Sequence, residues 1–464
     1  MTSQVFITVR ELGEKLRSGT VSPTDLTELF LARLEEYGPR LNAVAHLTRE
    51  RAMKFAKKTE MELKKGKIRS PLHGVPWGAK DLLATKDYPT SWGAAPFKDR
   101  VLPYNAAVVE KLDKSGAVLL AKLAMIELAG GMVYKQPNAC WTGPCRTPWS
   151  MGHWSGGSSS GSGSAVSSGL VPFAIGSETW GSILSPANNC GVSGLRPTYG
   201  RVSRRGAMAL SWTLDKIGPL CQTADDCGLV FESIVGPDRG DPSTTKRKYR
   251  YELFEGPFKV AILKNATEGA ENAVTSNYNA AIKVVEKYAT VEEVEFPDFP
   301  YDQITRTILN SEAVSAFEEF LEDGLSHKLT APEDHYGSYS RFGVLAVDYL
   351  RALRLRSRVV KIAETVMKPY DAILAPTSKR TAAPIDQEFR RNLGNLQDIM
   401  GAIGNGAGLP SVSVPSGFDS QGLPTGIQFM GRPYDENRIL SVAVEYQLRT
   451  EWHKKHPKDF TPKK

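Results

Sequence analysis

The amino-acid sequence predicts an α/β fold, in which short buried strands alternate with helices. From about residue 70, short apolar runs follow one another between Gly- and Pro-rich turns, which is typical of buried strands joined by loops and helices. The apolar runs lie at residues 117–121, 258–263, 371–376 and 411–415. Helical segments are predicted near residues 272–289 and over 340–368. With 464 residues, of which 41% are hydrophobic, the chain can bury a large core.

Two helices are expected before the first strand. In the second of them, Ser22 precedes Pro23, which places an N-cap residue before a proline at the first helical position. Apolar side chains then recur at helical spacing as far as Tyr37, and Gly38 with Pro39 is expected to end the helix. Such a helix packs on a core and by itself indicates no function.

Composition and charge exclude several classes of protein. Charged residues make up 23% of the chain, which also contains 41 glycines and 29 prolines, so a disordered, collagen-like or small disulfide-rich protein is excluded. The formal net charge is +7, and five lysines between residues 454 and 464 account for most of it. The rest of the chain is nearly balanced, so no nucleic-acid partner is predicted.

Cysteine usage and the N-terminal sequence predict a cytoplasmic protein without metal or cofactor. The five cysteines form no CxxC pair, and neither metal-ligand spacing nor an HExxH motif occurs. The first 16 residues lack the apolar segment of a signal peptide, and no run of about 18 apolar residues is present that would span a bilayer. We therefore expect reduced thiols, no membrane partner and no metal.

The Gly- and Ser-rich part of the chain, residues 143–200, is the most informative for function. It contains GGSSSGS at 156–162 and GSETWGS at 176–182. Glycine lets backbone N–H groups approach a ligand and serine supplies hydroxyls, so the two stretches together suit an oxyanion site beside a nucleophile. On composition alone, a pair of surface loops is an equally good interpretation.

Several catalytic interpretations of these motifs compete. A P-loop requires Lys-Ser or Lys-Thr after the Gly-rich run, and neither occurs. Residues 157–161 match the GxSxG of a hydrolase nucleophile elbow, but a poor strand precedes them. The histidines that this elbow would need lie in polar, loop-like or tail sequence, at His327, His335, His453 and His456. An SxxK match at 243–246 lacks its SDN or KTG partner. The remaining interpretation uses Lys80, in the apolar, turn-rich segment 74–81, as a base.

The chain resembles the amidase signature family. The motifs that carry the resemblance are GVPWGAKD (74–81), GGSSSGSGSAVSSGLVPFAIGSETWGSILSPANNCGVSGLRPTYGRVS (156–203) and LDKIGP (214–219), with weaker matches at APT (375–377) and over 406–431. The resemblance implies an α/β/α fold with a large mixed central sheet covered by helices. It also implies one domain over residues 1–464, with a signature core at about 70–220 that 371–431 completes and a more variable segment at 236–340. Within that segment, residues 236–250 are expected to be an exposed connector.

The family resemblance implies a Ser–cis-Ser–Lys triad. Its nucleophile position falls on Ser182, the bridging serine on Ser158 and the base on Lys80. The 24 residues that separate Ser158 from Ser182 match the family motif, and the family's cis peptide falls between Gly157 and Ser158. Ser159 resembles a supporting hydrogen-bond position. The backbone N–H groups implied as oxyanion donors belong to Thr179, Trp180, Gly181 and Ser182.

The implied chemistry requires an uncharged lysine. The reference pKa of lysine is about 10.4, and burial without a carboxylate partner lowers it. Neutral Lys80 would then take a proton from Ser158, which takes one from Ser182 as that residue attacks an acyl carbon. A carboxylate directed at the lysine would oppose this, so Asp81 is expected to turn away and pair with a base such as Arg196. Asp215 is likewise expected to form a structural ion pair.

Some positions depart from the family pattern where the acyl pocket is expected. Trp180 stands where the family usually has glycine, and Leu184 stands where it commonly has arginine. Gly130, Gly131 and Met132 occupy the position at which family members line the pocket. These residues predict an apolar or aromatic pocket wall. Core packing is an alternative for Met132 and for the Trp180 side chain.

The resemblance implies an enzyme that hydrolyses the carbon–nitrogen bond of a linear small-molecule amide through an acyl-enzyme, with carbamates and esters as further substrates. One alternative is the glutamine-hydrolysing subunit of a tRNA-dependent amidotransferase, which would need partner subunits. Another is a non-catalytic binding or scaffold protein, which the presence of all three triad residues disfavours. The sequence leaves open the natural amide, the acyl-chain length, the oligomeric state (a homodimer is one option) and the role of residues 290–340.

Overall fold

The computed structural model describes residues 4–389 and 398–462. Most of the strands belong to one sheet, and β4 (Arg146–Thr147) pairs separately with β5 (Ser150–Trp154). The strands of the large sheet are β1 (Val44–Leu47), β2 (Pro76–Lys80), β3 (Val118–Leu123), β6 (Phe173–Glu178), β7 (Ser193–Arg196), β8 (Lys216–Cys221), β9 (Phe258–Leu263), β10 (Ala289–Val294), β11 (Ala372–Pro376), β12 (Ser411–Phe418) and β13 (Pro424–Met430).

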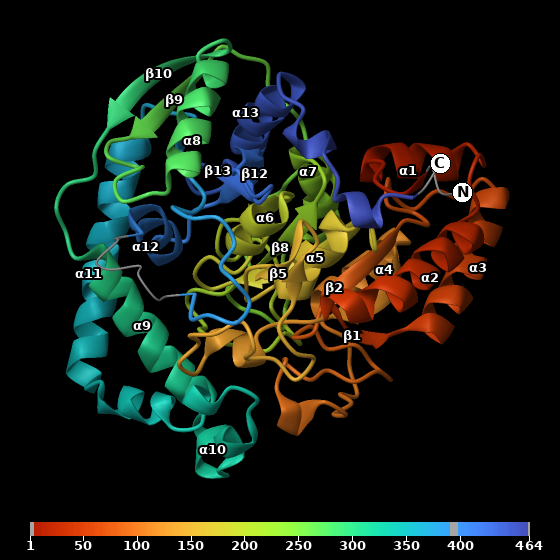
Figure 1. The fold of residues 1–464 in the computed structure, drawn as a ribbon, viewed down its shortest axis with the longest axis horizontal. Coiled ribbons are helices and arrows are strands. Elements are labelled where there is room, and N and C mark those ends of the chain that lie inside the picture. Colours follow the sequence, from red (N-terminus) through yellow and green to blue (C-terminus); the bar gives the residue numbers. More distant parts are fainter. Residues whose placement is uncertain (1–3, 390–397, 463–464) are drawn as a thin grey trace.

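The large sheet is mixed, as the sequence predicts. Within the described residues it has 11 strands, in the order β1-β3-β2-β6-β8-β7-β12-β13-β11-β9-β10. Strand β2 pairs in parallel with β3 and β6, whereas β6 and β8 are antiparallel. Strands β12 and β13, from the C-terminal part of the chain, lie between β7 and β11 and join the two halves of the sheet (Figure 1).

Helices surround this sheet and bury its central strands. Every residue of β2, β3, β6 and β8 is buried, so both faces of the central sheet are covered. The α-helices are α1 (Val9–Arg17), α2 (Pro23–Leu41), α3 (Arg49–Lys64), α4 (Ala107–Ser115), α5 (Ser160–Ser167), α6 (Leu184–Cys190), α7 (Ala224–Ile234), α8 (Asn272–Val285), α9 (Tyr301–Ala316), α10 (Glu318–Glu322), α11 (Ala346–Met367), α12 (Ile399–Gly406) and α13 (Glu436–Leu448). Short 3₁₀ turns are η2 (Ala95–Phe97), η3 (Glu127–Gly130), η4 (Leu325–Lys328), η5 (Pro332–Asp334), η6 (Gly337–Gly343), η7 (Trp452–Lys454) and η8 (Lys458–Phe460).

The two N-terminal helices are present, but the second ends later than the sequence predicts. The Ser22 hydroxyl accepts hydrogen bonds from two backbone N–H groups of the first turn of α2, as expected of an N-cap. The helix nevertheless continues through Gly38 and Pro39 to Leu41. A proline in the last turn removes a single hydrogen bond, and the carbonyls of Gly38 and Pro39 still accept from the two residues that follow the helix.

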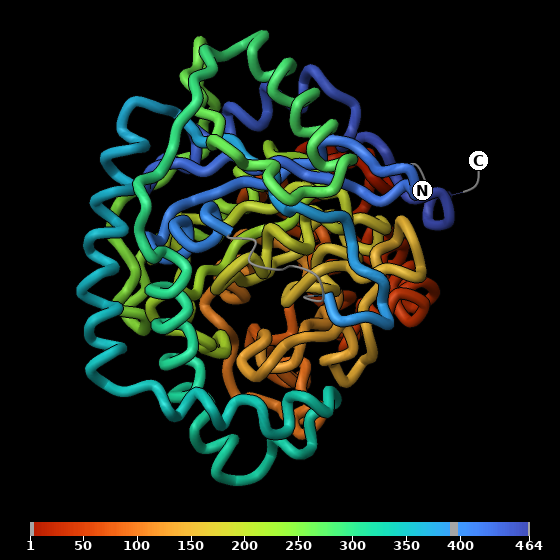
Figure 2. Tube along the Cα trace, turned by 60° about the vertical axis from the view of Figure 1, so that its left-hand side comes forward, coloured from red at the N-terminus to blue at the C-terminus, as the bar shows by residue number. Residues whose placement is uncertain are grey.

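The variable segment, residues 236–340, supplies strands β9 and β10 at one end of the sheet and the helices α8, α9 and α10. Helix α9 packs against α11 and α12, which lie outside this segment, and these helices stand along one side of the molecule in Figure 2. Residues 236–250 contain no helix or strand, as expected of a connector, but Asp241 within them is buried and accepts a hydrogen bond from the backbone of Arg204. The organisation of residues 1–464 as one domain stays a prediction.

Two further sequence expectations concern membrane spans and cysteines. In the described parts of the chain, none of the helices combines the length and the apolar character needed to cross a bilayer. All five cysteines are buried and carry free thiols.

Candidate active site

The strand order brings the predicted base close to the predicted nucleophile loop. Strand β2 ends at Lys80, and its parallel neighbour β6 ends at Glu178, immediately before the loop with Ser182. The carboxyl ends of adjacent parallel strands meet at the same edge of a sheet, so these two segments lie side by side. The GAKD and GSETWGS motifs are therefore brought together by strand pairing, although about 100 residues separate them.

Lys80 is completely buried and bonds to two hydroxyl groups. Its Nζ lies 2.8 Å from Ser158 Oγ, 3.0 Å from Ser177 Oγ and 3.3 Å from the Ser177 carbonyl oxygen. Burial lowers the pKa of Lys80 to about 7, against the opposing charges of Asp215 and Glu178. A large fraction of the side chain is therefore neutral near pH 7, and a neutral amine accepts a proton from an adjacent hydroxyl. Sequence reasoning missed Ser177, although it lies within the GSETWGS motif.

Ser158 and Ser159 begin the segment that leads into α5. The peptide bond between Gly157 and Ser158 is cis, as the resemblance implies. The Ser159 hydroxyl donates to the Ser177 carbonyl at 3.1 Å and accepts from the Ser177 N–H at 3.2 Å, while the Ser159 N–H donates to the Ser182 carbonyl at 3.2 Å. Ser159 thus ties the Ser158 segment to the end of β6 and to the nucleophile loop.

Ser182 lines a cavity of about 660 Å³ together with Thr179 and Trp180. Its side chain is largely buried, and within the described residues its hydroxyl has no hydrogen-bond partner. Across the same part of the chain, the backbone N–H groups of residues 180–182 donate to no protein acceptor. A free hydroxyl next to unpaired N–H groups is the arrangement needed to attack a carbonyl and hold the oxyanion. Within the described residues, the Ser182 hydroxyl makes no hydrogen bond with Ser158, whose own hydroxyl bonds to Lys80.

Glu178 fixes the loop around Ser182, a function that sequence reasoning did not assign. One carboxylate oxygen accepts from the N–H groups of Ile183 and Leu184 at 2.9 and 3.1 Å, and the other pairs with Arg196 at 2.8 Å. Leu184 is therefore held at the start of α6, 4% exposed and packed in the core. It does not line the cavity, which corrects the expectation that it contributes to the pocket wall.

Asp81 turns away from Lys80 as expected, but its partner is not Arg196. It pairs with Lys122 at 2.9 Å, and both side chains are completely buried. It also accepts hydrogen bonds from the hydroxyl and the backbone N–H of Ser91, the latter at 3.0 Å. The reason is the sheet register, because β3 lies beside β2 and places Lys122 next to the segment that holds Asp81.

Asp215 forms no ion pair within the described chain, so that expectation is wrong. Its carboxylate accepts a 2.5 Å hydrogen bond from the Thr179 hydroxyl and bonds of 2.8 and 3.0 Å from the N–H groups of Leu210 and Ser211. Burial raises the pKa of Asp215, and these hydrogen bonds oppose the rise. The aspartate connects the oxyanion loop to the segment before β8.

The turn at residues 127–134 lines the cavity, and of the predicted residues Gly130, Gly131 and Met132 it is Gly130 that does so. Met132 is 1% exposed and belongs to the core, and Gly131 is also buried, with the Phe317 ring directly against the site of a Cβ. The cavity wall here also includes Ala129, Val133 and Tyr134, which were not predicted. Left-handed backbone at Leu128 and Ala129 redirects the chain here, which a position-by-position transfer from the family does not anticipate.

The Trp180 side chain forms part of the cavity wall instead of packing beneath the loop. Its Nε1 donates to Asp398 at 3.0 Å, and the Arg306 guanidinium lies 5.1 Å from the ring centroid. Arg306 in turn makes two 2.9 Å hydrogen bonds with Asp302 on α9, and Asp398 caps α12 through the N–H of Gly401. No local motif marks Asp302, Arg306 or Asp398, so sequence reasoning did not find them.

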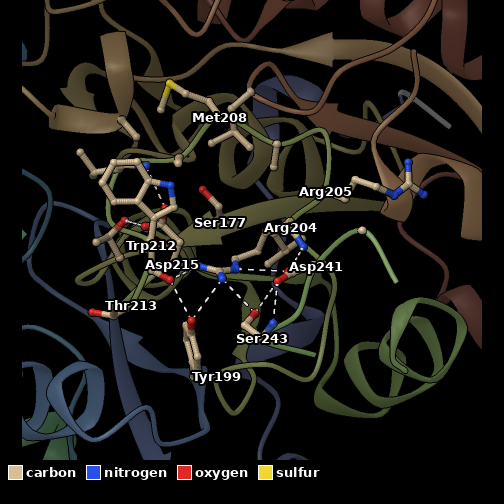
Figure 3. A pocket seen from close by; sticks show the side chains of 18 of the residues that line it. Ser177, Tyr199, Arg204, Arg205, Met208, Trp212, Thr213, Asp215, Asp241 and Ser243 are labelled. Atoms are coloured by element: carbon tan, nitrogen blue, oxygen red, sulfur yellow. Dashed lines mark hydrogen bonds and ion pairs between the residues drawn. The ribbon is translucent and has the colours of Figure 1, made fainter. Parts of the chain in front are cut away.

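A second cavity, of about 460 Å³, lies next to the same loop (Figure 3). Ser177 and Thr179 lie in its wall, together with Asp215 and Trp212. In the described residues, no group of three or more His, Cys, Asp or Glu side chains is placed to hold a metal ion.

Comparisons with known proteins agree with this geometry. The Amidase family profile matches residues 25–440. One subunit of the glutamyl-tRNA(Gln) amidotransferase from Coxiella burnetii is 34% identical over 97% of this chain and 99% of its own length. The native peptide amidase from Stenotrophomonas maltophilia superposes with a TM-score of 0.85 at 28% identity, over 96% of this chain and 97% of that structure. A chain of a vestigial protein complex, described as revealing the evolutionary origins of an s-triazine catabolic enzyme, superposes with a TM-score of 0.87 at 28% identity. The match covers 96% of this chain and 98% of that chain. The profile match covers most of the chain and carries the signature motifs around Lys80 and Ser182, so this protein belongs to the amidase signature family.

Proposed function

We propose that this chain hydrolyses the carbon–nitrogen bond of a linear small-molecule amide through an acyl-enzyme on Ser182. The family supports amidohydrolase activity in general. The observation that carries the specific proposal is the 2.8 Å contact between Ser158 and the buried Lys80, whose pKa is about 7. Such a pair is a base at neutral pH and lies next to a loop whose Ser182 hydroxyl and backbone N–H groups have no protein partner among the described residues.

The proposed reaction begins when neutral Lys80 takes the Ser158 proton while Ser158 takes the Ser182 proton. Ser182 Oγ then bonds to the carbonyl carbon, and the N–H groups of residues 179–182 hold the negative oxygen. When the carbon–nitrogen bond breaks, the electron pair goes to nitrogen, which receives a proton from Ser158 as Lys80 returns its own. Water then cleaves the acyl-enzyme by the same route.

For the acyl side of the substrate, we propose an apolar or aromatic group that packs against Trp180. Leu184 and Met132 do not contribute to this preference, because both are buried in the core. Further out, the cavity wall carries the pair of Asp302 and Arg306, whose charges compensate each other. Carbamates and esters are proposed as further substrates because their carbonyls suit the same attack. A cytoplasmic location and a homodimer stay predictions.

A second candidate is the glutamine-hydrolysing subunit of a tRNA-dependent amidotransferase. The relative from Coxiella burnetii, 34% identical over nearly the whole chain, favours it. This candidate predicts glutamine as the substrate and dependence on partner subunits, whereas our first proposal predicts turnover by the isolated chain. A scaffold protein would hydrolyse neither glutamine nor any other amide, with or without partner subunits.

The test is a panel of acyl anilides, primary amides, carbamates and glutamine, assayed with the purified chain, together with labelling by a serine-reactive phosphonate. We expect turnover of at least one non-glutamine amide and a phosphonate adduct on Ser182, both lost in Ser182→Ala. Ser159→Ala is the matched control and should still be labelled on Ser182. Equal labelling of Ser182→Ala, or an adduct on Ser159, would contradict the assignment of the nucleophile.

A further inference from the structure

The second cavity shares part of its wall with the Ser182 cavity. Ala129, Thr179 and Leu210 line both cavities, so only these residues and their neighbours separate the two spaces. Ser182 and Trp180 line the first cavity. Ser177 and Asp215 line the second (Figure 3). The oxyanion loop therefore stands between two cavities, one on each side of Thr179.

The inner end of the second cavity lies on the side of the base. Ser177, in its wall, holds Lys80 through both its hydroxyl and its carbonyl, at 3.0 and 3.3 Å. The cavity is thus one hydrogen bond away from the lysine. Thr179, which lines both cavities, is held by its bond to Asp215, so its position where the two cavities adjoin is fixed.

We infer that the second cavity is the subsite for the amine portion of the substrate; this inference rests on the proposed amide hydrolysis. The acyl portion stays bonded to Ser182 after the carbon–nitrogen bond breaks, so it occupies the Ser182 cavity. The nitrogen receives its proton from Ser158, which Lys80 reprotonates, so the leaving amine lies on the side of the base. Ser177, which bonds to Lys80, lines the second cavity on that side.

The walls of the second cavity select an uncharged group. Many of the lining residues are apolar, among them Leu82, Ala207, Met208, Ala209, Leu210 and Ile217. The charged side chains already have partners within the protein, because Arg204 lies 3.5 Å from Asp241 and Arg205 pairs with Glu110 and Asp238. Asp215, which makes no ion pair within the described residues, accepts hydrogen bonds from Thr179, Leu210 and Ser211. Trp212 adds an aromatic surface, 45% exposed. The predicted substrate is therefore an amide with a neutral, apolar or aromatic substituent on nitrogen.

The volume of the cavity agrees with this class of substituent. At about 460 Å³ it falls in the range of 300–1,000 Å³ that is usual for small-molecule sites. Ammonia, the product of a primary amide, would leave most of it empty. A primary amide and an N-aryl amide with the same acyl group therefore fill this cavity differently, and comparing each variant with the wild type on the same substrate removes their difference in leaving-group reactivity.

The experiment narrows the second cavity with Ala209→Phe and compares an anilide with the primary amide of the same acyl group. We expect kcat/KM for the anilide to fall about 10- to 100-fold while that for the primary amide changes less than threefold. Val133→Phe, in the Ser182 cavity, is the matched control, and it should lower kcat/KM for both substrates by the same factor. Equal losses in Ala209→Phe, or no loss for the anilide, would overturn the inference.

A second variant and a labelling control keep the result interpretable. Met208→Ala widens the cavity and should raise the preference for N-aryl over primary amides, so an unchanged preference also counts against the subsite. Phosphonate labelling of Ser182 in each variant reports whether the nucleophile is intact. If the wild type is neither labelled nor active, the proposed hydrolysis fails; if it is labelled and active but Ala209→Phe does not discriminate, only the subsite fails.

Discussion

The Thr179 hydroxyl donates a 2.5 Å hydrogen bond to Asp215, and this bond joins the oxyanion loop to the segment before β8. Asp215→Asn keeps the size of the side chain and removes its charge. We expect kcat to fall at least about tenfold with little change in KM, because loop N–H groups that are misplaced lose their stabilisation of the transition state. The charge of Asp215 raises the pKa of Lys80, so its removal should also move the rising limb of the pH–rate profile to lower pH.

Two threonine variants separate these effects of Asp215. Thr179→Val removes the hydrogen bond but keeps the carboxylate, so it should lower kcat without moving the pH profile. Thr179→Ser keeps the hydroxyl and should stay close to wild type. An Asp215→Asn enzyme with unchanged kcat and an unchanged profile would show that the bond has no influence on the reaction.

The pH–rate profile of the wild type should rise from acid pH to a plateau, with a midpoint near 7. The reason is that Lys80 must be neutral to accept a proton and its pKa is about 7. Lys80→Ala should lower kcat roughly 10²–10⁴-fold at pH 7.5, and Ser158→Ala should lower it by a similar factor. The matched control is Lys122→Met, another completely buried lysine, which leaves Asp81 unpaired and should lower the melting temperature without moving the midpoint. Near wild-type rates in Lys80→Ala would exclude the lysine as base.

Trp180 should set the preference on the acyl side. Trp180→Gly removes the aromatic wall, so kcat/KM for amides with an aromatic acyl group should fall about 10- to 100-fold. For amides with a small or polar acyl group, kcat/KM should stay the same or rise. Trp180→Phe keeps an aromatic ring but loses the bond to Asp398, and it should retain most of the preference. A uniform loss on all acyl groups, or only a lower melting temperature, would mean that the side chain is structural.

Glu127 and Asp334 should make the stability depend on pH. Both carboxyl groups are buried, and burial raises the pKa of Glu127 to about 8, with the nearby charge of Asp334 adding to the rise. The folded chain therefore keeps a proton that the unfolded chain releases above about pH 4.5. The free energy of unfolding should fall as pH rises from 5 towards 8, by at most about 1.4 kcal/mol per pH unit for this proton.

Thermal unfolding at several pH values checks this dependence. Glu127→Gln cannot lose a proton, so the decline of its melting temperature between pH 6 and 8 should be shallower than in the wild type. Glu110→Gln, at a partly exposed carboxylate, is the control and should keep the wild-type slope. If the melting temperature declines equally steeply with pH in the wild type and in Glu127→Gln, Glu127 does not keep its proton in the folded chain.

The features that could be predicted from the sequence are those that short motifs determine. The α/β class and the cap of α2 follow from local patterns, whereas the mixed sheet and the approach of Lys80 to Ser158 follow from the family resemblance that the motifs carry. The partner of Asp81 could not be predicted because it depends on the register between β2 and β3.

The pocket wall was the least predictable part of the site. The left-handed backbone at Leu128 and Ala129 turns Met132 into the core, which no spacing of apolar residues reveals. Arg306 and Asp398 reach Trp180 from helices more than 100 residues further along the chain. Their positions depend on tertiary packing. Because no motif surrounds either residue in the sequence, their contact with Trp180 could not be predicted.

The position of β12 between β7 and β11 has a consequence for how the protein is made. More than 200 residues separate Arg196, at the end of β7, from Ser411, at the start of β12. At 5–20 residues per second, a ribosome needs roughly 10–40 s to translate that stretch. During this time the growing polypeptide exposes the unpaired edge of β7, and such an edge is a template for pairing with other chains. We therefore expect the nascent chain to require shielding by a chaperone, and the enzyme to become active only after nearly all of it has left the ribosome.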